Sequence, residues 1–404
     1  MNASYMSAES GTVDAISDRV APNIVVYTQE YPTPNNPTDG VFTQQLVDAL
    51  PQYANVTVVR PLPWWPAWRL ARAISSWTPS TGIPLRTKRG VSDVYFPRVP
   101  LIPFVTRMLN PIIQALRAYP ILRRMKRLGK LDVLNVHSVY PDGVTGAMLA
   151  RWLDVPLVLT ALGSDINVSL TKPFQLRQVK WALRTASACV GVSDDLCEKM
   201  RRLGARVEVR RIPNGIDKKR FYPPKSLANE QPVVLFVGRL HPVKGLQYLV
   251  AAVGELKRAG ALNFKTVIVG EGGEEGALRA QCAELGIEKD VSFVGARSHD
   301  EIGDWMRTAS VFCLPSLNEG MPNVLIEAQA CAVPIVASNV GGIPEIVSAD
   351  TGLLVPPANP SALAEALKAA VSKNWNRQKI AENVAWADWN QTAKQYAELI
   401  ARIR

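Results

Sequence analysis

The sequence predicts an α/β protein of two Rossmann-like, doubly wound domains that face each other across a cleft. Short β-branched apolar segments alternate with helical segments along most of the 404 residues, which is the pattern of parallel sheets covered by helices. The alternation is interrupted by a polar, proline-rich segment at 216–232 and then restarts. Because a chain of this length usually forms two or three domains with separate cores, we expect two α/β domains in tandem.

The N-terminal domain is expected to span residues 23–216. The pattern predicts helices at 44–50 and 143–153, and strands at 23–28, 55–60, 131–137, 155–161 and 188–193. The preceding residues, 1–22, contain Glu9, Asp14 and Asp18 and no apolar core. We therefore expect a loose leader there and not a signal peptide.

The C-terminal domain is expected to span residues 217–384. The pattern predicts a helix at 246–257 and strands at 232–238, 265–270, 291–295, 310–315 and 334–338. The remaining segment, 385–404, repeats apolar residues with helical spacing, so we expect the chain to end in a helix.

The composition excludes several classes of protein. The sequence has no run of about 18 apolar residues, so a membrane-spanning helix is not expected. Its five cysteines are scattered without a C-x-x-C pair, which indicates free thiols in a reducing cytoplasm. Potential metal ligands do not cluster either, so we expect no metal site.

The excess of positive charge lies entirely in residues 1–216, because the remaining residues hold 20 Lys and Arg against 20 Asp and Glu. The net charge is +11, and residues 1–216 hold 26 Lys and Arg against 15 Asp and Glu. Within them, residues 60–130 hold 14 basic residues and one acid, together with tryptophans at 64, 65, 68 and 77. This mixture suits a surface that lies on an anionic membrane, although a solvated basic face would have the same composition. No nucleic-acid-binding motif accompanies the charge, so nucleic acid is not expected.

Ligands of parallel α/β sheets bind beyond the carboxyl ends of the strands, and the segment 238–245 follows such an end. It reads G-R-L-H-P-V-K-G, in which Gly238 permits a sharp turn, and Arg239 and Lys244 lie near a helix N-terminus. Two cations in that position suit a diphosphate, whereas two surface cations are the alternative. Gly270 opens a glycine-rich loop after another strand, for which a simple turn is an equally good interpretation.

The segment 316–330, S-L-N-E-G-M-P-N-V-L-I-E-A-Q-A, follows a further strand. Pro322 fits the first turn of a helix, which leaves the backbone N–H groups around it free for an oxygen-rich ligand. Glu319 precedes this helix and Glu327 lies more than a turn along it, so the two carboxylates address different ends of one ligand. Because carboxylates accept hydrogen bonds from sugar hydroxyls, a diphosphate with two such groups indicates a nucleotide-sugar.

Four residues of the first domain follow strands or precede helices in the same way. Gly40 ends a loop rich in proline and asparagine, and His137 ends a strand. His137 is as readily a structural histidine, but its strand-end position opposite a second domain favours a place in the site. Asp165 and Asn214 lie in strand-end loops on the expected acceptor side, where an Asx-turn or a helix cap also explains either residue.

These motifs resemble those of the retaining glycosyltransferases of family four (glycosyl transferases group 1), which have the GT-B fold. The resemblance covers residues 23–400 and is carried by G-R-L-H-P-V-K-G-L, E-G-M-P-N-V-L-I-E, G-G-I-P-E-I-V, G-L-L-V-P-P and R-I-P-N-G-I-D. Within this family, the sequence most resembles bacterial exopolysaccharide and teichuronic acid transferases. Two departures are a single glycine in P-T-D-G-V-F, where the family often has a pair, and Leu162 in L-G-S-D, where it often has histidine.

The resemblance implies a role for each matching residue. Arg239 and Lys244 would neutralise the donor diphosphate, Glu327 would hold the ribose, and Glu319 with the backbone of 320–323 would hold the transferred sugar. Gly40 would approach the phosphates, His137 would line the donor-sugar pocket, and the final helix would cross back to the first domain. The implied catalytic residues are His137, Arg239, Lys244 and Glu319. The implied donor-binding residues are Gly40, Gly238, Arg239, Lys244, Gly270, Gly295, Glu319, Gly320, Met321, Pro322, Asn323, Val324, Leu325 and Glu327.

The predicted activity is the transfer of a hexose from a UDP- or GDP-sugar, with retention of configuration, to a saccharide or lipid-linked acceptor. We expect it to serve cell-surface polysaccharide biosynthesis, in the cytoplasm at the inner face of the membrane. No cofactor or metal is expected, because no D-x-D occurs in a suitable strand-end loop. The alternatives are a nucleotide-sugar epimerase of the same fold and a non-catalytic nucleotide-sugar-binding protein at the membrane surface.

Overall fold

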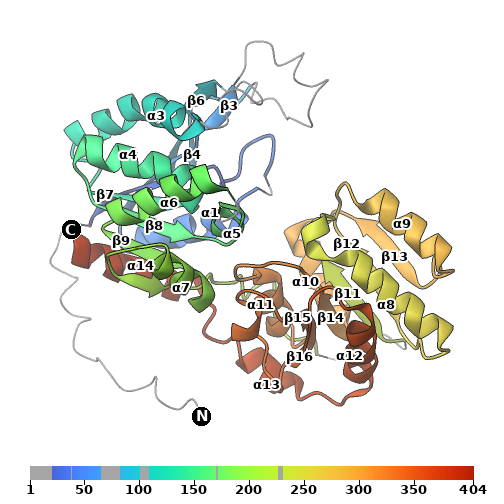
Figure 1. The fold of residues 1–404 in the computed structure, drawn as a ribbon. Coiled ribbons are helices and arrows are strands. Elements are labelled where there is room, and N and C mark those ends of the chain that lie inside the picture. The colour runs from blue at the N-terminus through green and yellow to red at the C-terminus, as the bar shows by residue number, and fades with distance from the viewer. Residues whose placement is uncertain (1–20, 38, 65–81, 101–108, 170–171, 226–230) are drawn as a thin grey trace.

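The computed structural model describes residues 21–37, 39–64, 82–100, 109–169, 172–225 and 231–404, and Figure 1 shows them in two α/β domains. Nearly all of the expected leader lies outside the described residues. So do three of the four tryptophans of the basic stretch, Trp65, Trp68 and Trp77.

The first domain is built on an eight-stranded sheet with the order β10-β9-β8-β7-β1-β2-β5-β4. Neighbouring strands run parallel, except that β4 pairs antiparallel with β5 at the edge. The strands are β1 (Asn23–Tyr27), β2 (Asn55–Val59), β4 (Arg86–Arg89), β5 (Ser92–Tyr95), β7 (Val133–His137), β8 (Leu157–Ala161), β9 (Ala188–Gly191) and β10 (Val209–Arg211). A separate parallel pair joins β3 (Leu62–Trp64) to β6 (Arg98–Pro100).

Helices cover both faces of this sheet, because its central strands are apolar on both sides. In β1, Val25 and Tyr27 belong to one hydrophobic cluster, and Ile24 and Val26 belong to the other. This alternation follows from the two-residue period of a strand. The helices of the domain are α1 (Val41–Ala49), α3 (Asn110–Arg127), α4 (Val144–Leu153), α5 (Ser164–Ser169), α6 (Pro173–Thr185) and α7 (Asp194–Arg202), with the short turns η2 (Leu50–Gln52) and η3 (Val139–Gly143).

The second domain is built on a six-stranded parallel sheet with the order β13-β12-β11-β14-β15-β16. The strands are β11 (Val233–Val237), β12 (Lys265–Val269), β13 (Val291–Gly295), β14 (Val311–Leu314), β15 (Ile335–Ser338) and β16 (Gly352–Val355). The helices are α8 (Leu246–Arg258), α9 (Glu275–Glu284), α10 (His299–Thr308), α11 (Asn323–Ala330), α12 (Pro360–Ser372) and α13 (Arg377–Glu382), with the short turns η4 (Pro242–Lys244) and η5 (Ile343–Glu345).

The last helix, α14 (Trp389–Ile403), returns to the first domain, where Figure 1 shows it in red beside the green helices. The carboxylate of Asp388 caps it by accepting from the N–H of Asn390 at 2.8 Å. Leu399 and Ile400 are buried in the same cluster as Ile24 and Val26 of β1. The helix therefore completes one face of the first sheet.

The proline-rich segment between the domains is anchored in its described part. Ile216 pairs with Asp388 in an isolated parallel bridge, and Phe221 is buried in the hydrophobic core. The sequence pattern predicts a linker here, and the bridge at Ile216 ties it to the second crossing of the chain between the domains.

Several regular elements of the first domain were not predicted from the sequence, and α3 and β4 are two of them. Helix α3 lies in the basic stretch, and its Pro120 and many arginines obscure the apolar repeat of Ala115, Ala118, Leu122 and Met125. The edge strand β4 carries R-T-K-R, a composition that discourages edge-to-edge pairing with other chains.

Within the described parts of the chain, no helix is both long enough and apolar enough to span a bilayer. All five cysteines are buried and free, which agrees with the prediction from their scattered positions.

Candidate active site

Several site residues, most of them predicted, follow strands at or next to the point where the strand order reverses in each sheet. β1 lies between β2 and β7 in the first sheet, and β11 lies between β12 and β14 in the second. Ligands of open parallel sheets bind beyond the carboxyl ends of the strands at such a reversal. Glu30 comes shortly after β1, whereas Arg239 follows β11 and Glu319 follows β14.

Three predicted glycines meet at the carboxyl edge of the second sheet. The N–H of Gly238 donates to the carbonyl of Val269 at 3.0 Å, and the N–H of Gly270 donates to the carbonyl of Gly295 at 2.9 Å. Gly270 has a φ of 138°, and a Cβ atom there would lie 1.9 Å from the carbonyl oxygen of Gly238. The absence of side chains thus lets these loops pack backbone against backbone.

Lys244 and Glu319 form an ion pair between two strand-end loops. Lys244 Nζ lies 2.7 Å from Glu319 Oε1, and the hydroxyl of Ser316 donates to the same oxygen at 2.7 Å. Gly245 makes the approach possible, because its φ is 66° and a Cβ atom there would lie 2.1 Å from the carbonyl oxygen of Pro315. The structure therefore brings together the predicted diphosphate cation and the predicted sugar carboxylate. Ser316 was not predicted, although its position three residues before Glu319 is a usable signal.

Arg239 is exposed at the end of β11, near enough to Glu30 of the first domain for their charges to interact. Glu30 is exposed to solvent, but partial desolvation is still the largest influence on the pKa of its carboxyl. Together with the charges of Asp165 and Asp39, it raises the pKa of Glu30 to about 7, and Arg239 acts in the opposite direction. Glu30 was not predicted, although it follows the first strand much as Arg239 follows β11.

Helix α11 begins one residue later than the sequence predicts. Pro322 is its N-cap, with φ −75° and ψ 105°, and not a residue of its first turn. Met321 and Leu325 are buried in the core, where Val324 also packs, and the N–H of Leu325 donates to the carbonyl of Pro322 at 3.0 Å. Met321 and Leu325 of the predicted donor-binding segment therefore offer a ligand no exposed side chain, whereas Val324 is partly exposed.

Glu327 is buried on α11 beside a histidine that was not predicted. Its Oε1 lies 3.5 Å from His299 Nε2. Burial raises the pKa of Glu327 to about 8, and burial followed by the charge of Arg220 lowers the pKa of His299. Both groups are therefore mainly neutral at pH 7. The ring of Phe42, from the first domain, meets the ring of His299 edge-on at 6.4 Å, and no motif in the sequence signals this contact.

The first-domain loop depends on Gly40. Its φ is 61°, and a Cβ atom there would lie 2.1 Å from the carbonyl carbon of Glu30, so a side chain would displace the loop. The neighbouring Asp39 forms a 2.6 Å ion pair with the largely buried Arg60, whose Nε donates to the carbonyl of Gln29 at 3.0 Å. Arg60 thus fixes both ends of the loop that carries Gly40.

His137, the last residue of β7, is buried against α14. Its ring stacks on Tyr396 with a centroid distance of 6.0 Å and an interplanar angle of 17°. Burial lowers its pKa to about 4, and among the described residues its Nε2 has no hydrogen-bond partner. These surroundings are those of a structural histidine, and its place in the donor-sugar pocket stays a prediction that its burial disfavours.

The two predicted acceptor-side residues form structural contacts. Asp165 accepts from the N–H of Val139 at 2.6 Å and from that of Gly163 at 2.7 Å, which ties the ends of β7 and β8 together. The side-chain amide of Asn214 donates to Asn323 Oδ1 at 3.2 Å, across the domain boundary. Asn214 therefore contacts the donor side of the site.

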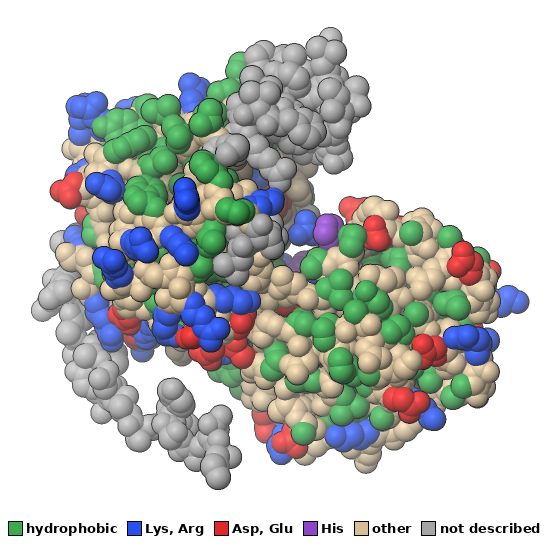
Figure 2. Space-filling view, in the orientation of Figure 1, with side chains coloured by type: hydrophobic (Ala, Val, Ile, Leu, Met, Phe, Trp, Pro, Cys, Tyr) green, Lys and Arg blue, Asp and Glu red, His purple; other side chains and the backbone are tan. Residues whose placement is uncertain are grey.

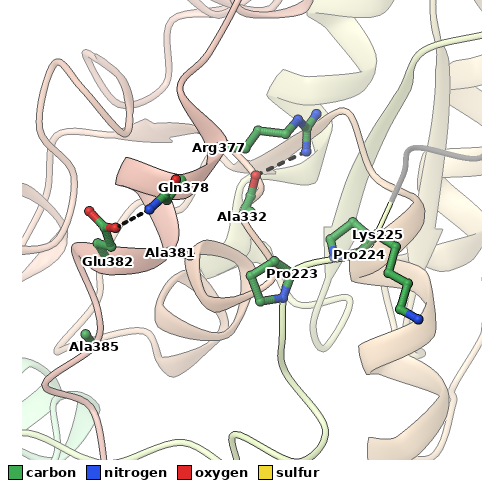
Figure 3. A pocket seen from close by; sticks show the side chains of 9 residues that line it. All are labelled: Pro223, Pro224, Lys225, Ala332, Arg377, Gln378, Ala381, Glu382 and Ala385. Atoms are coloured by element: carbon green, nitrogen blue, oxygen red, sulfur yellow. Dashed lines mark hydrogen bonds between the residues drawn. The ribbon is translucent and has the colours of Figure 1, made fainter.

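A pocket of about 530 Å³ lies elsewhere in the second domain (Figure 3). Proline side chains of the segment before the second sheet and residues of α13 line it, and Arg377 there donates to the carbonyl of Ala332 at 3.1 Å. It shares no residue with the predicted site, so we do not assign the activity to it. The described portion of the chain holds no group of three or more His, Cys, Asp or Glu arranged to bind a metal.

The two halves of the chain match two family models. Residues 40–220 match Glycosyltransferase Family 4, and residues 217–385 match Glycosyl transferases group 1. The chain is 28% identical over 365 residues to TuaC of Bacillus subtilis (strain 168), a glycosyltransferase assigned to teichuronic acid biosynthesis, over 85% of this chain and 88% of TuaC. It is 30% identical over 309 residues to the D-inositol 3-phosphate glycosyltransferase of Jonesia denitrificans, over 68% of this chain and 73% of that enzyme.

The fold also matches solved structures. HepE of Anabaena, solved in complex with UDP and glucose, superposes with a TM-score of 0.69 at 22% identity, over 94% of this chain and 99% of HepE. At 22% identity, this likeness supports a shared fold and not a shared activity. The two parallel-sheet domains thus form a GT-B fold, and the chain belongs to the glycosyltransferases that join a Glycosyltransferase Family 4 domain to a Glycosyl transferases group 1 domain.

Proposed function

We propose that the protein transfers a hexose from a UDP- or GDP-sugar to a saccharide or lipid-linked acceptor, with retention of configuration and without a metal. The observation that carries this proposal is the 2.7 Å pair of Lys244 and Glu319, at the strand-order reversal of a glycosyltransferase. The diphosphate of a donor needs a cation, and its sugar needs a hydrogen-bond acceptor. In this site the cation, Lys244, and the acceptor, Glu319, are in contact.

Donor binding would rearrange this ion pair. The diphosphate carries more negative charge than one carboxylate, so it would take Lys244 Nζ as a partner and release Glu319. Glu319 could then accept hydrogen bonds from the hydroxyls of the transferred sugar, while Ser316 keeps one of its oxygens oriented. Arg239 and the N-terminus of α11 would add to the positive potential around the leaving phosphate.

Bond cleavage in this site would depend on charge stabilisation. The sugar–phosphate bond breaks through an oxocarbenium-like state, and Arg239 and Lys244 would hold the departing diphosphate. Attack from the same face retains the configuration, and the leaving phosphate then takes the proton of the acceptor hydroxyl. Glu327 would accept from the ribose, at a position where burial already favours hydrogen bonding over ion pairing.

A membrane-bound acceptor would meet the first domain. The exposed side of α3 carries both apolar and basic side chains, with Ile112 and Leu116 beside Arg123, Arg124 and Arg127. In Figure 2, basic and hydrophobic side chains are interspersed over the first domain. We include in the proposal that this surface rests on an anionic bilayer at the inner face of the membrane, in polysaccharide biosynthesis.

The test of this function begins with the donor. Thermal shifts measured with UDP-, GDP- and ADP-sugars identify the ligand, because a ligand at 100 times its Kd stabilises the fold by about 2.7 kcal/mol. With that donor, we expect Lys244→Ala to lower kcat/KM for transfer about a hundredfold or more. The matched control is Lys379→Ala, which removes an exposed ion pair with Asp350 on the same domain, and it should transfer at the wild-type rate.

Near-normal transfer by Lys244→Ala would contradict the diphosphate assignment. Release of an epimerised nucleotide-sugar in the absence of acceptor would identify the epimerase alternative. Donor binding without transfer to any acceptor would identify a nucleotide-sugar-binding protein instead.

A further inference from the structure

Helix α7 of the first domain is capped by a residue of the second domain. The N–H of Asp194 donates to Glu345 Oε2 at 2.8 Å, and the N–H of Asp195 donates to Glu345 Oε1 at 2.9 Å. These are the first two N–H groups of the helix, which have no partner within a helix. Both oxygens of one carboxylate are therefore engaged by a helix that lies 150 residues earlier in the chain.

The helix does not lack carboxylates of its own. Asp194 and Asp195 both stand in its first turn, but Asp195 forms a 2.7 Å pair with Lys199. The side chain of the local N-cap, Ser193, accepts from the N–H of Leu196 at 3.3 Å, and its carbonyl accepts from the N–H of Cys197 at 3.1 Å. The remaining N–H groups and the positive end of the helix are left to Glu345, and such charge-assisted bonds are stronger than neutral ones.

Gly342, three residues before Glu345, lets this turn lie close to both Ser193 of the first domain and Gly320 of the second. A Cβ atom on Gly342 would lie 2.9 Å from Ser193 Cβ and 2.1 Å from the carbonyl oxygen of Gly320. The N–H of Gly342 donates to that same carbonyl oxygen at 2.9 Å. The turn that ends in Glu345 thus touches both the start of α7 and the segment that carries Glu319.

The other side of that segment rests on the first domain. A Cβ atom on Gly320 would lie 2.4 Å from the carbonyl oxygen of Leu162 and 2.7 Å from the Cα of Gly163. Gly320 is therefore enclosed between the Gly342 turn and the loop after β8. If α7 moved away from Glu345, this enclosure would open.

We infer that Glu345 is a positioning residue: by capping α7 across the domain boundary, it holds the arrangement in which Gly320 meets Leu162 and Gly163. Both of its oxygens accept from backbone N–H groups of α7, so we assign it no role in holding the donor. Its effect on catalysis rests on the proposed transfer activity, since Glu319 lies next to Gly320. Its effect on the domain contact does not depend on that activity.

The test compares Glu345→Ala with Asn359→Ala, measured on the full chain. Asn359 caps α12 by accepting from the N–H of Ala362 at 3.0 Å, so its removal costs a cap within one domain only. We expect Glu345→Ala to speed hydrogen exchange about tenfold in peptides covering 190–203 and 316–325. Asn359→Ala should leave both peptides unchanged. Glu345→Gln, which keeps one accepting oxygen, should fall between wild type and Glu345→Ala.

The second measurement separates positioning from general stability. For Glu345→Ala we expect kcat for transfer to fall about tenfold, while the Kd for UDP or GDP, whichever the donor carries, stays within twofold of wild type. Unchanged exchange in 190–203 would overturn the cap, and faster exchange with unchanged kcat would overturn the positioning role. If the wild type transfers no sugar from any donor, the proposed function fails, and the exchange data still decide whether Glu345 holds the domains.

Discussion

The surroundings of Glu327 decide whether its carboxyl carries a charge. It is buried on α11, and its described ionisable neighbour is His299, which burial keeps neutral. The pKa of Glu327 is raised from 4.5 to about 8. In the folded protein it therefore binds a proton over a pH range in which the unfolded chain has released it.

This difference makes stability depend on pH in a defined direction. Between pH 4.5 and 8 the folded state holds one more proton than the unfolded state, so the contribution of Glu327 to stability falls as pH rises. The slope approaches about 1.4 kcal/mol per pH unit. We expect Glu327→Gln to remove this slope and to raise the midpoint of thermal unfolding at pH 8 more than at pH 5.

The control for this prediction is Glu382→Gln, which alters an exposed carboxylate of the same domain. It should shift the midpoint equally little at both pH values. Parallel pH profiles for wild type and Glu327→Gln would show that Glu327 is ionised in the folded protein.

Sequence reasoning located the residues whose position follows from a strand end, and their roles stay predictions. Arg239, Lys244 and Glu319 come after the carboxyl ends of β11 and β14, and the fold brings such ends together whatever the details of packing. It is weaker for His137, because a strand-end position does not say which face of the sheet the last side chain takes. His299 was missed because its partner Glu327 lies on another helix, and that pairing depends on tertiary packing.

Helix α3 is the element that the membrane proposal depends on. One side of α3 is apolar and packs in the core. On the other side, Leu116 is 59% exposed, and basic residues share that side with it. Each basic residue near an anionic surface contributes about 1 kcal/mol. We expect the double variant Arg124→Gln/Arg127→Gln to bind vesicles of phosphatidylglycerol and phosphatidylcholine about thirtyfold more weakly in a sedimentation assay.

The matched control removes the same charge from a different helix. Arg201→Gln/Arg202→Gln alters two exposed arginines of α7, and its vesicle binding should stay near that of wild type. Equal losses in both double variants would indicate a nonspecific effect of net charge. An absence of binding at low salt, where electrostatic screening is weakest, would remove the membrane from the proposal.

The elements predicted best are those whose apolar residues follow a clear strand or helix pattern. The central strands and α8 match their predicted ranges to within a few residues, because β-branched runs and apolar helical spacing both reflect burial. Among the elements that were not predicted are the edge strand β4, its neighbour β5 and the proline-containing α3. Edge strands are half solvated, so their sequence carries less of the two-residue period than a buried strand does.

The whole molecule is joined by a chain that passes between the domains twice. The second passage ends in α14, whose Leu399 has no exposed surface and packs on the first sheet. We expect Leu399→Ala to destabilise the first domain by about 2–5 kcal/mol. Hydrogen exchange should quicken in β1 and β2 while β11 and β12 keep their protection.

The complementary variant is Leu367→Ala, which opens a cavity beneath α12 in the second domain, where Leu367 is equally buried. It should reverse the pattern and quicken exchange in β11 and β12. Loss of protection in the second domain alone after Leu399→Ala would show that α14 does not belong to the first.

The position of α14 also determines the order in which the two domains can complete their folding during synthesis. A ribosome delivers β1 and its neighbours first, and delivers residues 389–403 only after the whole second sheet has emerged. Until then the apolar face that includes Ile24 and Val26 lacks the helix that covers it in the finished protein. Because domains generally fold as units, the domain whose synthesis starts first is the one that is completed last.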